Sequence, residues 1–255
     1  MGGVKRSKVT VVGLGLIGGS LARALRRAGH DVRGYDRPRI WAQARTAGAI
    51  TGRRESLEAS VRDAEFVVLA APPAANLVLL RRVAEAADKE TVITDVGSVK
   101  GPICRAAARL HLREFVGGHP MAGTEGSGFQ ASSPGIFRGR AWILTPQGRN
   151  GRSVAKVSAL VRSVGGRVAL LDPSDHDRAV AFLSHLPQLL AWSLAGAVRD
   201  DKVARRYLSF AGPGFKDMTR LAQSPRGLWR EILRENRYEV ERALRAFTRV
   251  LRFRP

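Results

Sequence analysis

Short apolar runs recur through the first two thirds of the chain, and segments with helical periodicity separate several of them. We expect strands at Lys8–Val12, Val32–Tyr35, Glu65–Ala71, Thr91–Asp95, Phe115–Val116, Ala141–Leu144 and Arg167–Leu171. The expected helical segments are Ser20–Arg27, Ala75–Ala87 and Arg152–Val164. Continuous apolar runs are typical of strands buried on both faces, and strands that alternate with helices favour a parallel sheet. The first part of the chain is therefore predicted to be an α/β domain.

The pattern changes at Pro173, after which no further strand is predicted. Helices are expected at Asp175–Val198, Val203–Phe210 and Gly227–Leu251. We place the domain boundary at Asp172–Ser174. This gives an α/β domain of residues 1–173 and a helical domain of residues 174–255.

The segment Ala179–Val198 is apolar on most of its faces and long enough to cross a membrane. Ser184, His185, Pro187 and Gln188 interrupt it at mid-span, so a buried helix is favoured over a membrane helix. A helix that is apolar all round packs in a large core or in an oligomer interface. Because a domain of about 80 residues builds only a small core, we expect a homodimer formed through this domain, and no membrane partner.

Composition and charge narrow the function classes. Cys104 is the single cysteine of the 255 residues, which excludes a disulfide framework and a Cys-based zinc site. The five histidines are scattered without a His-x-x-x-His pair, so no metal site is predicted. The formal net charge of +21 would suit nucleic acid, but the basic residues are spread along the whole chain without interleaved aromatic residues. Only seven of the 43 basic residues are Lys, which indicates an Arg-for-Lys bias. We expect no specific nucleic-acid partner, but an attraction for anionic substrates.

The first strand leads into a glycine-rich turn, Gly13-Leu14-Gly15-Leu16-Ile17-Gly18, which a helix and a second strand follow. Gly13 suits a tight turn, Gly15 lets the backbone approach a pyrophosphate at the helix N-terminus, and Gly18 permits close helix–strand packing. The second strand ends at an acidic residue, Asp36, which completes the fingerprint. The chain is thus predicted to be a Rossmann-type dinucleotide-binding domain followed by an all-helical dimerisation domain.

The residue after the second strand bears on the choice of cofactor. Asp36 can accept hydrogen bonds from the adenosine ribose, and its charge would repel a 2′-phosphate, which favours NAD. Arg37 and Arg39 follow directly and could hold that phosphate instead, so NADP stays the alternative. The predicted cofactor-binding residues are Gly13, Gly15, Leu16, Ile17, Gly18, Asp36, Arg37, Pro72 and Ser98.

The stretch Gly117–Gly128, GGHPMAGTEGSG, holds the candidate for proton transfer. It is poor in bulky apolar residues, so we expect a loop rather than a core strand. His119 suits acid–base chemistry, and a turn with a capping His is the alternative. Because ligands bind at the carboxyl ends of parallel strands, His119, Ser98 and Lys100 should lie at the cofactor edge of the sheet.

Together these segments resemble the prephenate/arogenate dehydrogenase family of tyrosine biosynthesis over almost the whole chain. The resemblance rests on VVGLGLIGGSLARAL near the start, DVGSVK at Asp95–Lys100 and GGHPMAGTEGSG at Gly117–Gly128. It continues with DHDRAVAFLSHLP at Asp175–Pro187 and GFKDMTR at Gly214–Arg220. Many dehydrogenases share the glycine motif, whereas HPMAGTE, SHLP and F-x-D-x-T-R in this order are far more specific.

The resemblance implies a cytoplasmic enzyme that oxidatively decarboxylates prephenate to 4-hydroxyphenylpyruvate, with NAD as the hydride acceptor. His119 matches the catalytic His that draws off the proton of the ring hydroxyl, and Ser98 matches the Ser that shares this contact. Arg220 matches the Arg that holds a substrate carboxylate, a task suited to a bidentate guanidinium. The implied substrate-binding residues are Arg220, Thr124, Glu125, His185 and Gln188. For His185, a helix-packing imidazole is the alternative role.

Three other functions stay open. Many prephenate-specific members carry a second His where this chain has Gln188, so arogenate, or both compounds, is the first alternative substrate. A β-hydroxyacid-dehydrogenase-like reductase would be expected to use a catalytic Lys in the helical domain, where Lys202 and Lys216 lie outside any comparable motif. A non-catalytic nucleotide sensor would leave the co-occurrence of His119 and Ser98 with Arg220 unexplained. Some family members have a C-terminal regulatory domain, and we expect no feedback inhibition through such a domain here.

Overall fold

The computed structural model describes residues 6–124, 126–148 and 150–251. Its contacts divide the chain into two compact units, Met1–His176 and Asp177–Pro255. Each unit has a hydrophobic core of its own.

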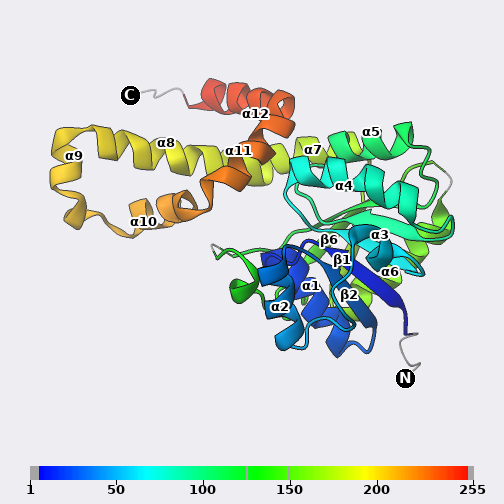
Figure 1. Ribbon diagram of the computed structural model, residues 1–255. Helices are drawn as coiled ribbons and strands as arrows, with labels where there is room; N and C mark the ends of the chain where they lie inside the picture. Colours follow the sequence, from blue (N-terminus) through cyan, green and yellow to red (C-terminus); the bar gives the residue numbers. More distant parts are fainter. Residues whose placement is uncertain (1–5, 125, 149, 252–255) are drawn as a thin grey trace. The chain divides into compact units, whose positions relative to one another are not determined.

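A seven-stranded sheet forms the centre of the first unit (Figure 1). Its strands are β1 (Lys8–Val12), β2 (Asp31–Tyr35), β3 (Phe66–Leu69), β4 (Val92–Asp95), β5 (Phe115–Pro120), β6 (Ala141–Thr145) and β7 (Arg167–Leu170). They lie in the order β2-β1-β3-β4-β5-β6-β7. Strands β1 to β5 are parallel, β6 runs antiparallel to β5, and β7 is parallel to β6. The predicted α/β fold class is confirmed.

Helices cover both faces of this sheet, because successive side chains of a strand point to opposite faces. Helices α1 (Leu16–Arg27), α2 (Pro38–Thr46) and α6 (Gly151–Ser163) pack on the face that bears Val9 and Val11. Helices α3 (Leu57–Val61), α4 (Pro73–Ala86) and α5 (Gly101–Arg109) pack on the face that bears Val12 and Leu69. With apolar groups required on both faces, the strands appear in the sequence as continuous apolar runs.

Strand β5 shows that the prediction of a loop from Gly117 onward was wrong for its first four residues. The strand extends through His119 to Pro120 with all six residues buried, and His119 pairs with Ile143 of β6. A Cβ at Gly117 would lie 2.2 Å from Oγ1 of Thr145, and one at Gly118 would lie 2.5 Å from the carbonyl oxygen of Asp95. The glycines therefore serve close packing of the backbone rather than a flexible turn.

In the second unit, all the regular secondary structure of the described residues is helical. Helix α7 (Pro173–Val180), the π-helical turn η2 (Ala181–His185) and α8 (Leu186–Asp200) form one continuous helix. Then follow α9 (Lys202–Arg206), η3 (Leu208–Phe210), α10 (Pro213–Thr219), η4 (Arg220–Gln223), α11 (Arg226–Glu235) and α12 (Arg237–Val250). Figure 1 shows α10 and α12 alongside the long helix, and a small core of Ala181, Leu186, Val240 and Ala243 joins the long helix to α12.

The long helix is only partly buried within one chain. By length and composition Pro173–Asp200 could cross a membrane, a test that core helices of soluble proteins also pass, and 33% of its most apolar window is buried. Large apolar side chains of this unit are exposed, among them Leu183 (77%), Phe210 (80%) and Tyr238 (72%). The unit therefore leaves several large apolar side chains exposed.

Candidate functional site

The turn between β1 and α1 has room for an anion where the sequence predicts one. Gly13 has a φ of +97°, and a Cβ there would lie 2.6 Å from the backbone of Ala70. A Cβ at Gly18 would lie 1.8 Å from the carbonyl oxygen of Gly13, so both positions require glycine. A Cβ at Gly15, by contrast, would meet no described atom within 4 Å. Gly15 is the N-cap of α1 and no side chain caps the helix there, so open space adjoins backbone N–H groups that suit an anion.

Asp36 lies at the end of β2 and is bonded to this turn. Its Oδ2 accepts a hydrogen bond from the backbone N–H of Leu14 (2.6 Å), and its Oδ1 accepts one from the N–H of Arg37 (2.6 Å). A carboxylate has about four acceptor positions, so Asp36 keeps capacity for ribose hydroxyl groups. The side chain of Arg37 is 87% exposed, and its Nε lies 4.0 Å from Oδ1 of Asp36. Arg39 is exposed as well.

The other predicted residues of the first unit follow the strand ends. Pro72 is the exposed N-cap of α4, after β3, and Ser98 is partly exposed in the loop between β4 and α5. Leu16 and Ile17, both partly exposed, open α1. Because β1, β3, β4 and β5 are parallel, their carboxyl ends share one edge of the sheet. The first unit thus brings the predicted cofactor residues to the edge that His119 also occupies.

His119 is 7% exposed and bonded to a second imidazole. Its Nδ1 lies 2.8 Å from Nε2 of His176 in α7, and the two rings meet edge to face. His176 is fully buried. One of the two nitrogens donates and the other accepts, so the contact fixes the orientation of the His119 ring. This contact engages Nδ1 of His119.

Two further polar residues near β5, Lys100 and Cys104, are buried in the core of the first unit. Lys100, expected at the cofactor edge, is fully buried and paired with Asp95. Burial raises the pKa of the Cys104 thiol, opposed by its hydrogen bond with Thr145, so this cysteine is an unreactive core residue. Among the described residues, no group of three or more His, Cys, Asp or Glu side chains could hold a metal ion.

The loop after β5 is anchored to the helix of the glycine turn. Thr124 is exposed, and its Oγ1 accepts a hydrogen bond from the N–H of Gly126 (3.3 Å). Glu125, implied to line the pocket, lies outside the described residues. Further along, the N–H of Ser133 donates to Oγ of Ser20 on α1 (2.9 Å). The loop is therefore tied to the nucleotide-binding helix.

His185 lies in the helical unit and is fully buried. Its Nδ1 lies 3.1 Å from Nδ2 of Asn236, which also donates to the carbonyl oxygen of Asp177 (2.8 Å). An amide nitrogen only donates, so Nδ1 of His185 accepts, and a neutral ring carries its proton on Nε2. Trp229 packs edge-on against this ring, with the centroids 6.0 Å apart.

Gln188 and Arg220 are linked through a turn of the same unit. Gln188 is fully buried, and its Nε2 donates to the carbonyl oxygen of Leu221 (2.8 Å). Leu221 belongs to η4, which begins at the exposed Arg220. Gln188 thus holds the backbone next to Arg220. The structure brings together Arg220, Gln188 and His185 in one unit, and His119 and Ser98 in the other.

Family comparison covers both units. Residues 21–170 match the family model of the prephenate dehydrogenase nucleotide-binding domain, and residues 172–252 match that of the prephenate dehydrogenase dimerization domain. The chain belongs to the prephenate dehydrogenase family. The resemblance predicted from the sequence motifs is confirmed.

Relatives in this family align over most of the chain. Prephenate dehydrogenase of Bacillus subtilis (strain 168) is 33% identical over 243 residues, which cover 92% of this chain and 66% of the relative. Cyclohexadienyl dehydrogenase of Zymomonas mobilis is 32% identical over 235 residues, which cover 89% and 80%. A crystal structure of prephenate dehydrogenase from A. aeolicus, in complex with hydroxyphenyl propionate and NAD+, has a TM-score of 0.90 at 32% identity and covers 97% of this chain and 88% of that one. The chain therefore spans just under two thirds of the Bacillus relative.

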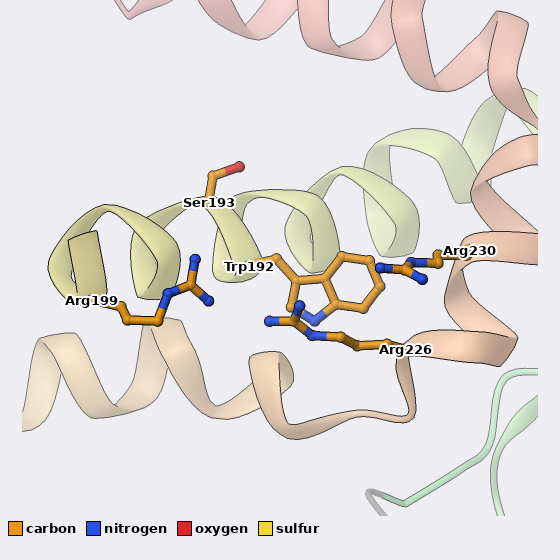
Figure 2. Close-up of a pocket in the computed structure, with 5 residues that line it drawn as sticks. All are labelled: Trp192, Ser193, Arg199, Arg226 and Arg230. Carbon is orange, nitrogen blue, oxygen red and sulfur yellow. The ribbon is translucent and has the colours of Figure 1, made fainter.

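The helical unit of this family member also has a basic hollow of about 240 Å³. Figure 2 shows the guanidinium of Arg226 in front of the indole of Trp192, with Arg199 and Arg230 on either side. The Arg226 guanidinium carbon lies 5.9 Å from the ring centroid. Three guanidinium groups around an indole form a surface that attracts anions. Arg199 is already paired with Asp200.

Sequence reasoning did not single out three residues that contact predicted site residues of this prephenate dehydrogenase family member. His176 bonds to His119, and its only signal was its place in the DHD sequence of a matching segment. Asn236 and Trp229 both contact His185. They lie more than 40 positions from it, so spacing along the chain gave no indication of these contacts.

Proposed function

We propose that this chain is an NAD-dependent prephenate dehydrogenase, which converts prephenate to 4-hydroxyphenylpyruvate and carbon dioxide. The observation that carries this proposal is a buried imidazole, His119, held through Nδ1 by His176 at the sheet edge that bears the glycine turn. Family membership and the prephenate dehydrogenases among the relatives support it.

The glycine turn fits a dinucleotide, because the space beside Gly15 is open where a pyrophosphate would bind. The backbone N–H groups of Leu16 and Ile17 would hold the pyrophosphate, and Asp36 would accept from the ribose hydroxyls. NAD, when bound, supplies the acceptor for the hydride that leaves the ring carbon bearing the hydroxyl. The NAD+ complex of the A. aeolicus relative supports this cofactor.

His119 is proposed to remove the proton of the ring hydroxyl through Nε2. For this, Nδ1 carries a proton and donates to Nε2 of His176, which acts as a neutral acceptor. As His119 becomes positively charged, this hydrogen bond becomes charge-assisted and strengthens, so it favours the transition state. Ser98, at the same edge, is proposed to hydrogen-bond the hydroxyl group.

Arg220 is proposed to bind a substrate carboxylate, since a guanidinium donates two parallel hydrogen bonds to this group. Gln188 is fully buried and bonds to the next residue, Leu221. We propose that Gln188 acts on the substrate through this turn. Thr124 and His185 stay proposed contacts of the substrate.

Arogenate, or both compounds, is the second candidate substrate. The Zymomonas mobilis relative, named cyclohexadienyl dehydrogenase, supports it. The test mixes the purified chain with NAD and either compound, and follows the absorbance of reduced cofactor and the release of carbon dioxide. Reduction with prephenate supports the proposal, reduction with arogenate alone favours the alternative, and no reduction with either compound refutes both.

The active form is proposed to be a homodimer that associates through the helical unit. The match of residues 172–252 to a dimerization domain supports this assembly, as do the exposed Leu183, Phe210 and Tyr238. A second copy would bury this apolar surface. Sedimentation of a stable, active monomer at micromolar concentration would contradict it.

A further inference from the structure

The first unit contains a buried ion pair next to His119, the residue proposed to transfer the proton. The side chains of Asp95, at the end of β4, and Lys100, just before α5, are 1% and 0% exposed. Nζ of Lys100 donates to Oδ2 of Asp95 and to the carbonyl oxygen of Gly118 (2.7 Å). An isolated buried charge is costly, so each partner depends on the other.

The same carboxylate holds the backbone at two places. Its Oδ1 accepts from the N–H of Gly118 (3.0 Å), and its Oδ2 accepts from the N–H of Gly97 (2.8 Å). Gly118 immediately precedes His119, and Gly97 immediately precedes Ser98. The ion pair therefore binds both the N–H and the carbonyl oxygen of Gly118, next to the proposed base His119. It also binds the N–H of Gly97, next to Ser98.

The geometry of the sheet explains why a charged pair is needed here. Strand β4 pairs with β5 only as far as Thr94 and Val116, and it ends at Asp95. Strand β5 continues to Pro120, so Gly118 lies past the last residue of β5 that pairs with β4. Asp95 and Lys100 supply the acceptor and the donor that a longer neighbouring strand would have supplied. An apolar pair of the same size would leave both groups of Gly118 buried without partners.

We propose that the Asp95–Lys100 pair is a positioning device, which fixes His119 and Ser98 at the sheet edge while adding no net charge beside the imidazole. The inference rests on the proposed function, because it assigns His119 the proton transfer. Among the described residues, the titratable groups that contact this part of β5 include Asp95 from β4, Lys100, Cys104 from α5 and His176 from α7. Asp95 and Lys100 form an ion pair with each other.

Removing one partner at a time changes the charge beside His119 in opposite directions. In Lys100→Met the carboxylate is left alone, still bonded to two backbone N–H groups, and it stabilises a protonated imidazole. In Asp95→Asn the ammonium is left alone and disfavours protonation. The midpoint of His119 titration should rise in the first variant and fall in the second. About one pH unit each way is expected for unit charges at an effective dielectric of about 20.

The experiment follows the ring signals of the five histidines by NMR in the full-length chain labelled at histidine, with His119 assigned from His119→Asn. This titration needs no substrate, so it tests the pair even if neither prephenate nor arogenate is turned over. The control is Leu80→Ala, a core truncation in α4 that should leave the midpoint unchanged. The double variant, Asp95→Asn with Lys100→Met, should return the midpoint towards wild type. If Lys100→Met does not fold, the downward shift in Asp95→Asn decides.

Activity gives the second readout. In either single variant kcat should fall at least about 10-fold, while KM for NAD stays within about twofold, because the pair does not hold the glycine turn. Midpoints that do not move, or that move in the same direction in both variants, would overturn the proposal. A kcat that falls no further than in Leu80→Ala would overturn it as well.

Discussion

Replacement of His176 tests the proton-transfer proposal most directly, because this residue is proposed to act only through His119. The side chain is fully buried, and its Nε2 lies 2.8 Å from Nδ1 of His119. His176→Leu removes that acceptor and keeps an apolar group of similar size in the core. His176→Gln keeps a polar atom that can accept.

The size of the effect follows from the change in this hydrogen bond during the reaction. A neutral hydrogen bond contributes about 0.5–1.5 kcal/mol, and one to a charged group about 1.5–3 kcal/mol. The ring of His119 is neutral in the ground state and charged after it takes the proton, so the transition state loses about 1–1.5 kcal/mol more than the ground state. For His176→Leu, kcat should therefore fall about 5- to 12-fold. KM for the substrate should change little, since His176 is buried behind His119.

The assay measures initial rates of cofactor reduction across the pH range in three variants. In His176→Leu the acidic limb should move to lower pH, because the protonated imidazole has lost an acceptor. His176→Gln should recover part of kcat. The control is His111→Asn, at an exposed position with a φ of +52° that Asn tolerates, and it should behave as wild type. The reasoning is refuted if His176→Leu keeps the wild-type kcat and acidic limb. Equal losses in the Leu and Gln variants would assign His176 to packing alone.

Three other variants separate chemistry, substrate binding and cofactor choice. His119→Asn keeps a hydrogen bond but cannot accept the proton, so kcat should fall about 10²–10⁴-fold. The acidic limb of the pH–rate profile, near the imidazole reference of about 6.5, should vanish. A kcat near that of the wild type would exclude His119 as the base. Arg220→Ala removes a charged hydrogen bond of about 1.5–3 kcal/mol, so steady-state kinetics should show KM for the substrate raised roughly 10- to 100-fold with a smaller change in kcat; an unchanged KM would remove Arg220 from the binding site. Asp36→Ser removes the carboxylate that disfavours a 2′-phosphate, so the ratio of kcat/KM for NAD to that for NADP should narrow; a wild-type enzyme that prefers NADP would instead point to Arg37.

Much of the fold could be predicted because its strands are buried on both faces and therefore form continuous apolar runs. Strand β1 has the predicted bounds, and β2 and β4 differ from the prediction by one residue at one end. Helices α2, α3, α5 and α10 were not predicted. They have 5 to 9 residues, too few for the periodicity of an amphipathic helix to emerge. Helix α1 begins at Leu16, four positions before the predicted start, because the glycine motif carries no helical signal of its own.

The candidate site could be predicted at the level of single residues, but its connections could not. Motif order pointed to His119 and Ser98, and parallel strands place both at one edge of the sheet. The bond between His119 and His176 joins positions 57 apart, and no period in the sequence relates them. Lys100 was expected at the cofactor edge because it follows a parallel strand, and ligands bind at the carboxyl ends of such strands. In the structure Lys100 is buried, because β5 extends beyond the end of β4 and the N–H and carbonyl oxygen of Gly118 need charged partners.

The glycines of this chain show why a motif alone does not fix the chemistry of a site. At Gly18 and Gly117 an added Cβ would overlap another atom at 1.8 Å and 2.2 Å, so these glycines let two parts of the chain approach each other. At Gly15 an added Cβ would enter open space, so there the absence of a side chain serves something outside the chain. All three positions are glycines in glycine-rich segments of the sequence. Only their surroundings in the structure distinguish a role in packing from a role in binding. The open position is the one at the N-terminus of α1, where a dinucleotide pyrophosphate is expected, and this agreement between shape and helix charge is the physical basis for assigning the cofactor to this turn.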